Sequence, residues 1–163
     1  MMIEYLSIIS LDTLAVVEER TGYINVNDIK EITWKKVENT KRYGTSEKYY
    51  DYHIIVIGQN ELAYSVAVCD ADSGNAEWSL YVARIYMNYL REYIEGNIQR
   101  LPVVNRLKII VASCSSSFET DKIQRDECIE KLRRRMMKAG YEDCLDIIDI
   151  IASPKFKYTI ISE

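Results

Sequence analysis

The sequence has few of the side chains from which common catalytic sites are built. It contains one histidine, His53, and four cysteines, Cys69, Cys114, Cys128 and Cys144. The cysteines lie 14 to 45 positions apart without a C-x-x-C pair, so no usual zinc-ligand spacing is present. A cysteine nucleophile would need a base, and a single histidine leaves little choice for that role. We therefore interpret the cysteines as small buried thiols.

The chain also lacks an excess of positive charge and a long apolar run. Its net charge of -4 provides no global basic field that would attract nucleic acid. No apolar run reaches the roughly 18 residues of a membrane span. The first residues contain an early acid, Glu4, and no basic region of a signal peptide. We expect a cytoplasmic protein with no membrane contact.

The amino-acid composition is that of a globular protein with an unusual bias. Hydrophobic residues make up 48% and charged residues 28%, and 163 residues suit one domain over 1–163, with a subdivision near 38–50 as the alternative. There are 22 isoleucines and 13 tyrosines beside 3 glutamines. Few glutamines are typical of a thermophile. Much isoleucine and tyrosine is also expected from an AT-rich genome, which favours a viral or mobile-element protein.

The pattern of apolar residues predicts strands first and helices later. Residues 3–37 form short strands, with 27–37 either a helical turn or a bent strand, and 38–50 form a polar loop. A hairpin turns at Gly58 to Asn60. Then follow a helix over 76–95, a buried strand from Leu107, a helix over 119–139, a further helix and a last strand. This order predicts an α+β fold, or α/β with a mixed sheet: N-terminal hairpins, then helix–strand–helix–helix–strand.

The predicted helix over 76–95, AEWSLYVARIYMNYLREYIE, is apolar around most of its circumference. A surface helix carries an apolar stripe of about 100°, and this one carries far more. Either the domain covers the helix on several sides, or a partner chain packs against one side. Because tyrosine is enriched at interfaces, the partner would contact Tyr81, Tyr86, Tyr89 and Tyr93.

The stretch KIIVASCSSSFETD, residues 108–121, joins a predicted strand to a predicted helix. Backbone amides at such a helix start can bind an anion, so Ser115, Ser116 and Ser117 are candidate phosphate contacts. The alternative is a capping box that satisfies the same amides. In the helix that follows, Arg134 and Lys138 could grip phosphate or could simply complement the helix dipole.

The best acidic cluster follows the hairpin, in VAVCDADSGNAEW. Asp70 and Asp72 end a strand, and Glu77 opens the next helix. Carboxylates in this arrangement can hold Mg²⁺ or Mn²⁺. The alternative is a turn of Asp, Ser, Gly and Asn that caps the helix.

From the hairpin to the serine loop, about residues 51–120, the order of elements resembles that of ribonuclease H-like proteins. The segments that carry this resemblance are NAEWSLYVARIYMNYL and LKIIVASCSSSF. In that family a helix Glu joins two strand aspartates around two metal ions. Glu77 matches the helix Glu, whereas Cys114 and either Ile57 or Gly58 stand at the two aspartate positions.

Two hypotheses of function follow. The first is a non-enzymatic binding or assembly protein without a cofactor, which forms a homo-oligomer or binds another protein through the tyrosine-rich helix 76–95. The second is a divalent-metal-dependent enzyme acting on nucleic acid or nucleotides, with Mg²⁺ or Mn²⁺ held by the acidic cluster.

Overall fold

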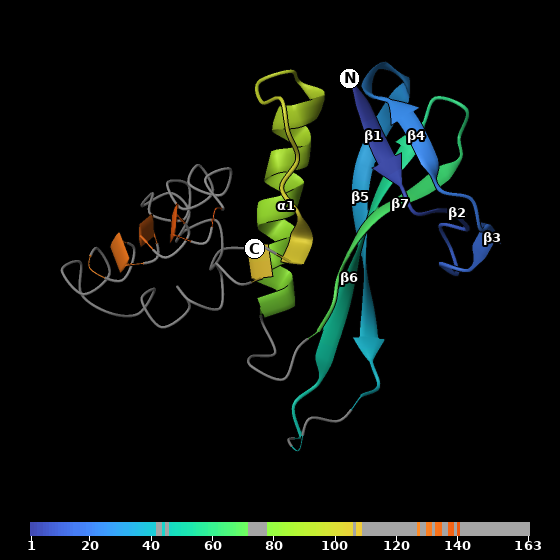
Figure 1. Cartoon of the computed structure of the whole chain (residues 1–163). Coiled ribbons are helices and arrows are strands. Elements are labelled where there is room, and N and C mark those ends of the chain that lie inside the picture. Colours follow the sequence, from blue (N-terminus) through green and yellow to red (C-terminus); the bar gives the residue numbers. More distant parts are fainter. Residues whose placement is uncertain are drawn as a thin grey trace.

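Seven strands and one long helix form the part of the chain that the structure describes (Figure 1). The computed structural model describes residues 1–41, 44, 46–71, 78–105 and 107–108, together with 127, 130–131, 133–134, 137–138 and 140. The elements are β1 (Met2–Tyr5), β2 (Ser7–Ile9), β3 (Val16–Glu18), β4 (Gly22–Asn25), the 3-10 helix η1 (Val26–Asp28), β5 (Ile29–Asn39), β6 (Tyr49–Gly58), β7 (Ala63–Cys69) and α1 (Trp78–Ile94).

The strands form two antiparallel sheets. The larger has the order β3-β2-β7-β6-β5, and β1 pairs with β4 in the smaller. Every pairing between described strands is antiparallel, and the later strands that would make the sheet a mixed one lie outside the described residues. Sheets plus a helix give the α+β class in its broad form. Of the predicted helix–strand–helix–helix–strand order, the first helix is described from Trp78 on as α1, and the later elements lie largely outside the described residues.

The long hairpin of β5 and β6 decides two questions that the sequence left open. Residues 29–39 form one strand, not a helical turn, because they pair with β6 along its whole length. The predicted loop over 38–50 is too long at both ends, since Asn39 pairs with Tyr49. The ammonium group of Lys36 also lies 4.0 Å from the centre of the Tyr50 ring. Pairing with a neighbouring strand thus overrides the polar composition at the ends of this loop.

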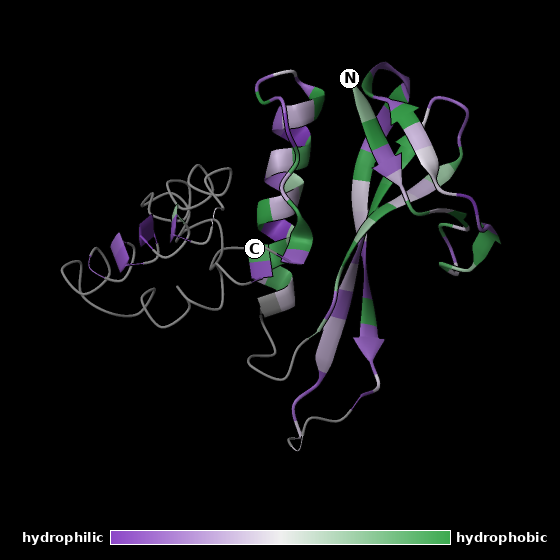
Figure 2. Cartoon of the chain, viewed as in Figure 1, coloured by the Kyte–Doolittle hydropathy of each residue, from purple (hydrophilic) through white to green (hydrophobic). Residues whose placement is uncertain are grey.

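The main core lies between α1 and one face of the large sheet. Alternate residues of β6 from Tyr52 to Val56 face α1, as the period of two requires. The intervening Ile55 and Ile57 belong to a second, smaller cluster with Ile9. Figure 2 shows that hydropathy changes along the β5–β6 hairpin, and that the end of the hairpin farthest from β1 is mainly hydrophilic. The packing that can position a site is therefore concentrated around α1.

The predicted helix over 76–95 is confirmed for its described residues, Trp78–Ile94. Gly96 ends it with φ +82°. The Gly96 N–H donates to the Tyr93 carbonyl and the Asn97 N–H to that of Glu92, the two bonds of a Schellman motif. Between Val82 and Leu90 nearly every residue is buried, Arg84 included. The helix is covered on several sides, which was one of the two alternatives.

The predicted strand from Leu107 begins as a helical turn. Leu107 and Lys108 are helical, and the Leu107 N–H donates to the Val103 carbonyl over 3.2 Å. Pro102 stands just before this turn with its φ already fixed near a helical value. Leu107 is fully buried as expected, because an apolar run predicts burial without separating strand from helix. The remainder of that strand, and the elements predicted after residue 140, lie outside the described residues.

Candidate functional site

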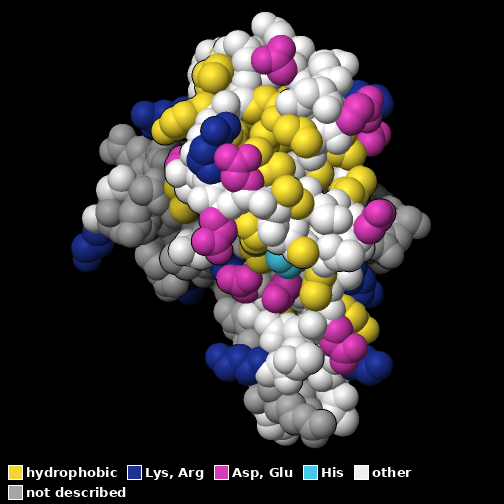
Figure 3. All heavy atoms as spheres, turned by 90° about the vertical axis from the view of Figure 1, so that its right-hand side faces the viewer, with side chains coloured by type: hydrophobic (Ala, Val, Ile, Leu, Met, Phe, Trp, Pro, Cys, Tyr) yellow, Lys and Arg dark blue, Asp and Glu magenta, His cyan; other side chains and the backbone are white. Residues whose placement is uncertain are grey.

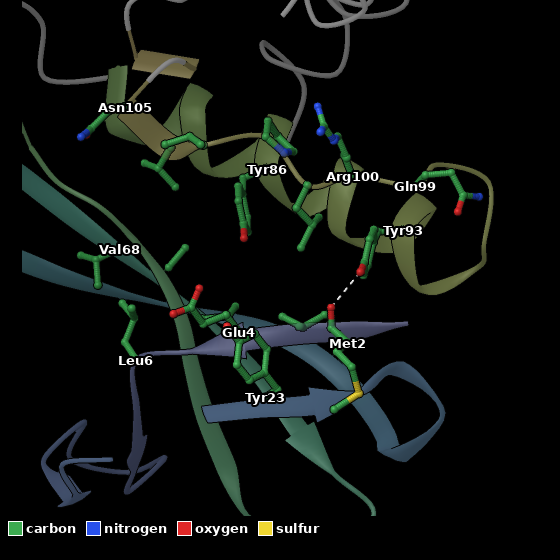
Figure 4. A pocket seen from close by; sticks show the side chains of 17 residues that line it. Met2, Glu4, Leu6, Tyr23, Val68, Tyr86, Tyr93, Gln99, Arg100 and Asn105 are labelled. Atoms are coloured by element: carbon green, nitrogen blue, oxygen red, sulfur yellow. Dashed lines mark hydrogen bonds between the residues drawn. The ribbon is translucent and has the colours of Figure 1, made fainter. Parts of the chain in front are cut away.

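A groove of about 660 Å³ opens between α1 and the two sheets (Figure 4). Strand β1 forms one wall, and residues 99–105, which follow α1, form the opposite wall. Residues 66–68 of β7 form part of its lining, and α1 contributes Tyr86 and Tyr93. We call it the β1–α1 groove. Its volume is in the range of sites that bind small molecules or short peptides.

Large apolar side chains are exposed around this groove. Met2, Leu6, Tyr23 and Val103 all line it, and between 48 and 65% of each residue remains accessible to solvent. Single exposed apolar residues are ordinary, but a contiguous exposed group around a cavity is typical of an interaction site. The exposed apolar surface at the groove therefore points to binding of an apolar partner.

Two tyrosines reach the groove from one face of α1. The Tyr93 hydroxyl donates to the Met2 carbonyl over 2.7 Å, which ties the helix to β1. Tyr86 is 5% exposed, and its hydroxyl points into the groove (Figure 4). Within the part of the chain that the structure describes, the Tyr86 hydroxyl makes no hydrogen bond. Burial, with a smaller contribution from Cys69, raises the pKa of Tyr86 to about 12. The group is therefore a neutral hydroxyl that can donate to a ligand.

The wall formed by β1 presents backbone groups to the groove. On the β4 side, the Val26 N–H donates to the Met1 carbonyl, so the odd-numbered residues of β1 bond to β4. Met2 and Glu4 therefore direct their N–H and C=O groups to the opposite side, where Tyr93 bonds to Met2. No other described strand pairs with β1 there.

Half of β7 also lacks a neighbour on its groove side. Strand β2 pairs with residues 63–65 of β7, and the Leu6 N–H donates to the Ser65 carbonyl. Beyond Ser65 the chain of β1 turns away to pair with β4. Among the described strands, none covers residues 66–69 of β7 on that side. Two open strand edges therefore face the same groove.

The charged groups at the groove are unevenly placed. Glu4 points its carboxylate into the groove, whereas Arg100 points away from it (Figure 4). Glu4 forms no ion pair within the described part of the chain. A single carboxylate on an apolar wall favours a ligand that carries a positive charge or a hydrogen-bond donor at that point.

Cys69 is a buried thiol of the core, as the sequence predicted for the cysteines. Its side chain is fully buried, and it forms no disulfide. Burial raises the pKa of Cys69 to about 12, an effect that Lys108 partly opposes and Asp70 increases. A thiol with so high a pKa is a poor nucleophile, so Cys69 is a packing residue.

A second pocket of about 430 Å³ lies at the other side of β4. The rings of Tyr5 and Tyr64 line it with their centroids 4.8 Å apart, and the Asn60 side-chain amide donates to the Tyr64 hydroxyl over 2.9 Å. Gly22 faces Tyr5 across the strand pair, where a Cβ would lie 2.5 Å from the Tyr5 hydroxyl oxygen. Because the chain itself uses these polar groups, the β1–α1 groove is the stronger candidate.

The predicted interface tyrosines lie mostly inside this chain. Tyr86, Tyr89 and Tyr93 are buried in the core that α1 forms, and Tyr81 is partly buried. An apolar, tyrosine-rich helix does not show from sequence alone whether its own domain or a partner chain covers it. The structure brings Tyr86 and Tyr93 to the groove, which sequence analysis missed. The apolar Met2 and Leu6 beside Glu4 were the only sequence signal for it, and such a pattern is common.

The predicted metal and phosphate sites stay predictions. Asp70 is exposed at the end of β7, whereas Asp72 and Glu77 lie outside the described residues. No group of three or more His, Cys, Asp or Glu that could hold a metal occurs among the described residues. The serines 115–117 also lie outside them. Arg134 and Lys138 are exposed and helical, and Arg134 pairs with Glu130 over 3.6 Å.

Comparisons with known proteins give no relative from which a role could be transferred. No protein-family model, no curated protein and no solved structure matches the chain. Within the described residues, no helix has the length and apolar character needed to cross a membrane.

Proposed function

We propose that this chain is a non-enzymatic binding protein that holds an apolar segment of another protein in the β1–α1 groove. The observation that carries the proposal is the group of large, exposed apolar side chains around the groove, namely Met2, Leu6, Tyr23 and Val103. Because about half of each side chain is already buried, covering one completely contributes about 0.8–1.5 kcal/mol. Covering all four offsets part of the cost of association.

The chemistry of the lining supports binding over catalysis. Among the described residues, the side chains that line the groove include no histidine, cysteine, serine or lysine. The ionisable groups in this set are Glu4, the arginine that points outward and three tyrosines. A tyrosine whose pKa is raised, such as Tyr86, neither attacks nor accepts a proton readily at neutral pH. These groups suit recognition through shape and hydrogen bonds.

The experiment is a selection of linear heptapeptides from a random displayed library against the full chain. We expect enriched sequences that bind the wild-type protein at least tenfold more tightly than Leu6→Asp. Leu62→Asp is the matched control, because Leu62 is similarly exposed but does not line the groove. If Leu6→Asp binds every enriched peptide as well as Leu62→Asp does, the groove is not the binding site.

Self-association is the second candidate, and strand β3 is the observation in its favour. β3 is an edge of the large sheet, and Val16 and Val17 are 50 and 70% exposed. Figure 3 shows hydrophobic side chains gathered on the side of the molecule where β2 and β3 lie, with acidic groups around them. The opposite edge, β5, carries many charges, a common protection against pairing with another chain.

Light scattering over a range of protein concentrations tests this second candidate. We expect a dimer of the wild-type chain that Val17→Lys converts to a monomer. Leu6→Asp serves as the control, because Leu6 lines the groove and is not part of β3. A wild-type chain that stays monomeric at millimolar concentration would exclude the β3 contact.

A further inference from the structure

We propose that the partner enters the β1–α1 groove as an added β-strand, which pairs with the edge of β7 that residues 66–68 present to the groove. The partner segment is extended, carries apolar side chains at alternate positions and places a lysine or arginine opposite Glu4. This inference rests on the proposed function and specifies the chemistry of the partner at the same site.

The edge of β7 at the groove offers unpaired backbone groups to a partner. After its last pair with β2, β7 presents residues 66–68 to the groove, and β6 pairs with its other side except at Val66, where the register shifts. Three residues of strand provide about 10 Å of edge. An unpaired edge is a template for a further strand, and peptide recognition by strand addition takes its affinity from such main-chain hydrogen bonds. A bound helix would leave these groups unpaired.

The wall formed by β1 also favours an extended partner. Because Val26 bonds to Met1 on the β4 side, Glu4 directs its own N–H and C=O toward the groove. A strand paired with β7 would therefore lie near further backbone donors and acceptors, those of β1. Because side chains of a strand alternate between two faces, every second residue of the partner would contact the apolar lining of the groove.

Charge complementarity selects the partner's sequence. The Glu4 carboxylate has no counter-charge among the described residues, and Arg100 points away from the groove (Figure 4). A basic side chain of the partner would reach Glu4 from the open side. The Tyr86 hydroxyl, buried and without a hydrogen bond in the described part of the chain, would donate to a carbonyl of the bound strand.

Hydrogen exchange tests the mode of binding with the peptides that the heptapeptide selection enriches. We expect backbone amides within residues 66–68 to gain protection on binding. Methylation of every second peptide amide should weaken binding at least tenfold when the methylated amides face β7. Methylation of the other set of amides should have little effect. Enriched peptides with helical spacing, or tight binding that tolerates methylation at every amide, would overturn strand addition and leave binding in the groove intact.

Charge reversal tests the sequence preference separately. Glu4→Lys should weaken basic peptides about two- to fivefold at low salt, which is the usual size of an exposed ion pair. Glu19→Lys makes the same charge change outside the groove and should have little effect. Tyr86→Phe should weaken the same peptides about two- to tenfold. Equal losses for Glu4→Lys and Glu19→Lys would overturn the role of Glu4.

Discussion

Tyr86 and Tyr93 form a natural matched pair for testing how the groove is built. They lie seven positions apart on one face of α1, both are buried, and both line the β1–α1 groove. Each substitution to phenylalanine removes one hydroxyl and keeps the ring. The hydroxyl of Tyr93 donates to the Met2 carbonyl over 2.7 Å, whereas that of Tyr86 makes no hydrogen bond within the described residues.

The expected costs follow from this difference. A hydrogen bond contributes about 0.5–1.5 kcal/mol net, and a partner left unpaired in a partly buried place adds to the loss. Tyr93→Phe should therefore lower the free energy of unfolding by about 1–2 kcal/mol. Tyr86→Phe removes a polar group that has no protein partner, so its effect on the free energy of unfolding should be within about 0.5 kcal/mol of zero, or stabilising.

Urea unfolding at pH 7, followed by circular dichroism, measures both values. We expect the midpoint of Tyr93→Phe to fall while the slope with urea stays unchanged, as for a change in stability alone. In a thermal scan, 1 kcal/mol corresponds to about 2–4 °C for a chain of this size. If Tyr86→Phe loses as much stability as Tyr93→Phe, the Tyr86 hydroxyl is engaged within the fold and is not available to a ligand.

Three further predictions concern the core, the thiol and the acidic cluster. Gly22→Ala should cost about 1–3 kcal/mol in thermal unfolding, because its Cβ would lie 2.5 Å from the Tyr5 hydroxyl oxygen; the cost should shrink in a Tyr5→Leu background. The stability contributed by the neutral Cys69 thiol is fully present below pH 9 and is lost as the pH rises toward its folded pKa of about 12. Urea unfolding at pH 8 and at pH 10.5 should show that the free energy of unfolding falls less between these pH values for Cys69→Ala than for the wild type. Equal falls would contradict the raised pKa of Cys69. The metal hypothesis predicts that Mn²⁺ at about 100 times its dissociation constant stabilises the chain by roughly 2.7 kcal/mol and that Asp70→Asn abolishes the shift; no shift with the wild type rejects it.

Local patterns predicted those elements that one stretch of chain defines. The hairpin at Gly58 and the helix that Gly96 ends have strong turn and cap signals, and both are confirmed. The ends of β5 and β6 cannot be predicted from local sequence, because their polar residues form strands only by pairing with each other. The strand predicted at Leu107 is a helical turn, because a short apolar run is compatible with both strand and helix.

The groove could not be predicted from sequence for a related reason. Its walls come from β1, β7 and the segment after α1, and no local pattern indicates that β1 turns away from β7 at Leu6. The tyrosines of α1 were singled out correctly as unusual, but their spacing fits a core face and an interface equally well. Asp70, Asp72 and Glu77 remain a hypothesis from spacing alone.

The hydrogen bond from Tyr93 to Met2 joins residues 91 positions apart in the chain. During synthesis β1 leaves the ribosome long before α1 exists, so the groove cannot close until about ninety further residues have been made. At roughly 5–20 residues per second, β1 and β4 spend several seconds without the helix that covers them. Whatever shields Ile3 and Ile24 in that interval, a chaperone or the early hairpins, determines how much of the newly made chain reaches its folded form.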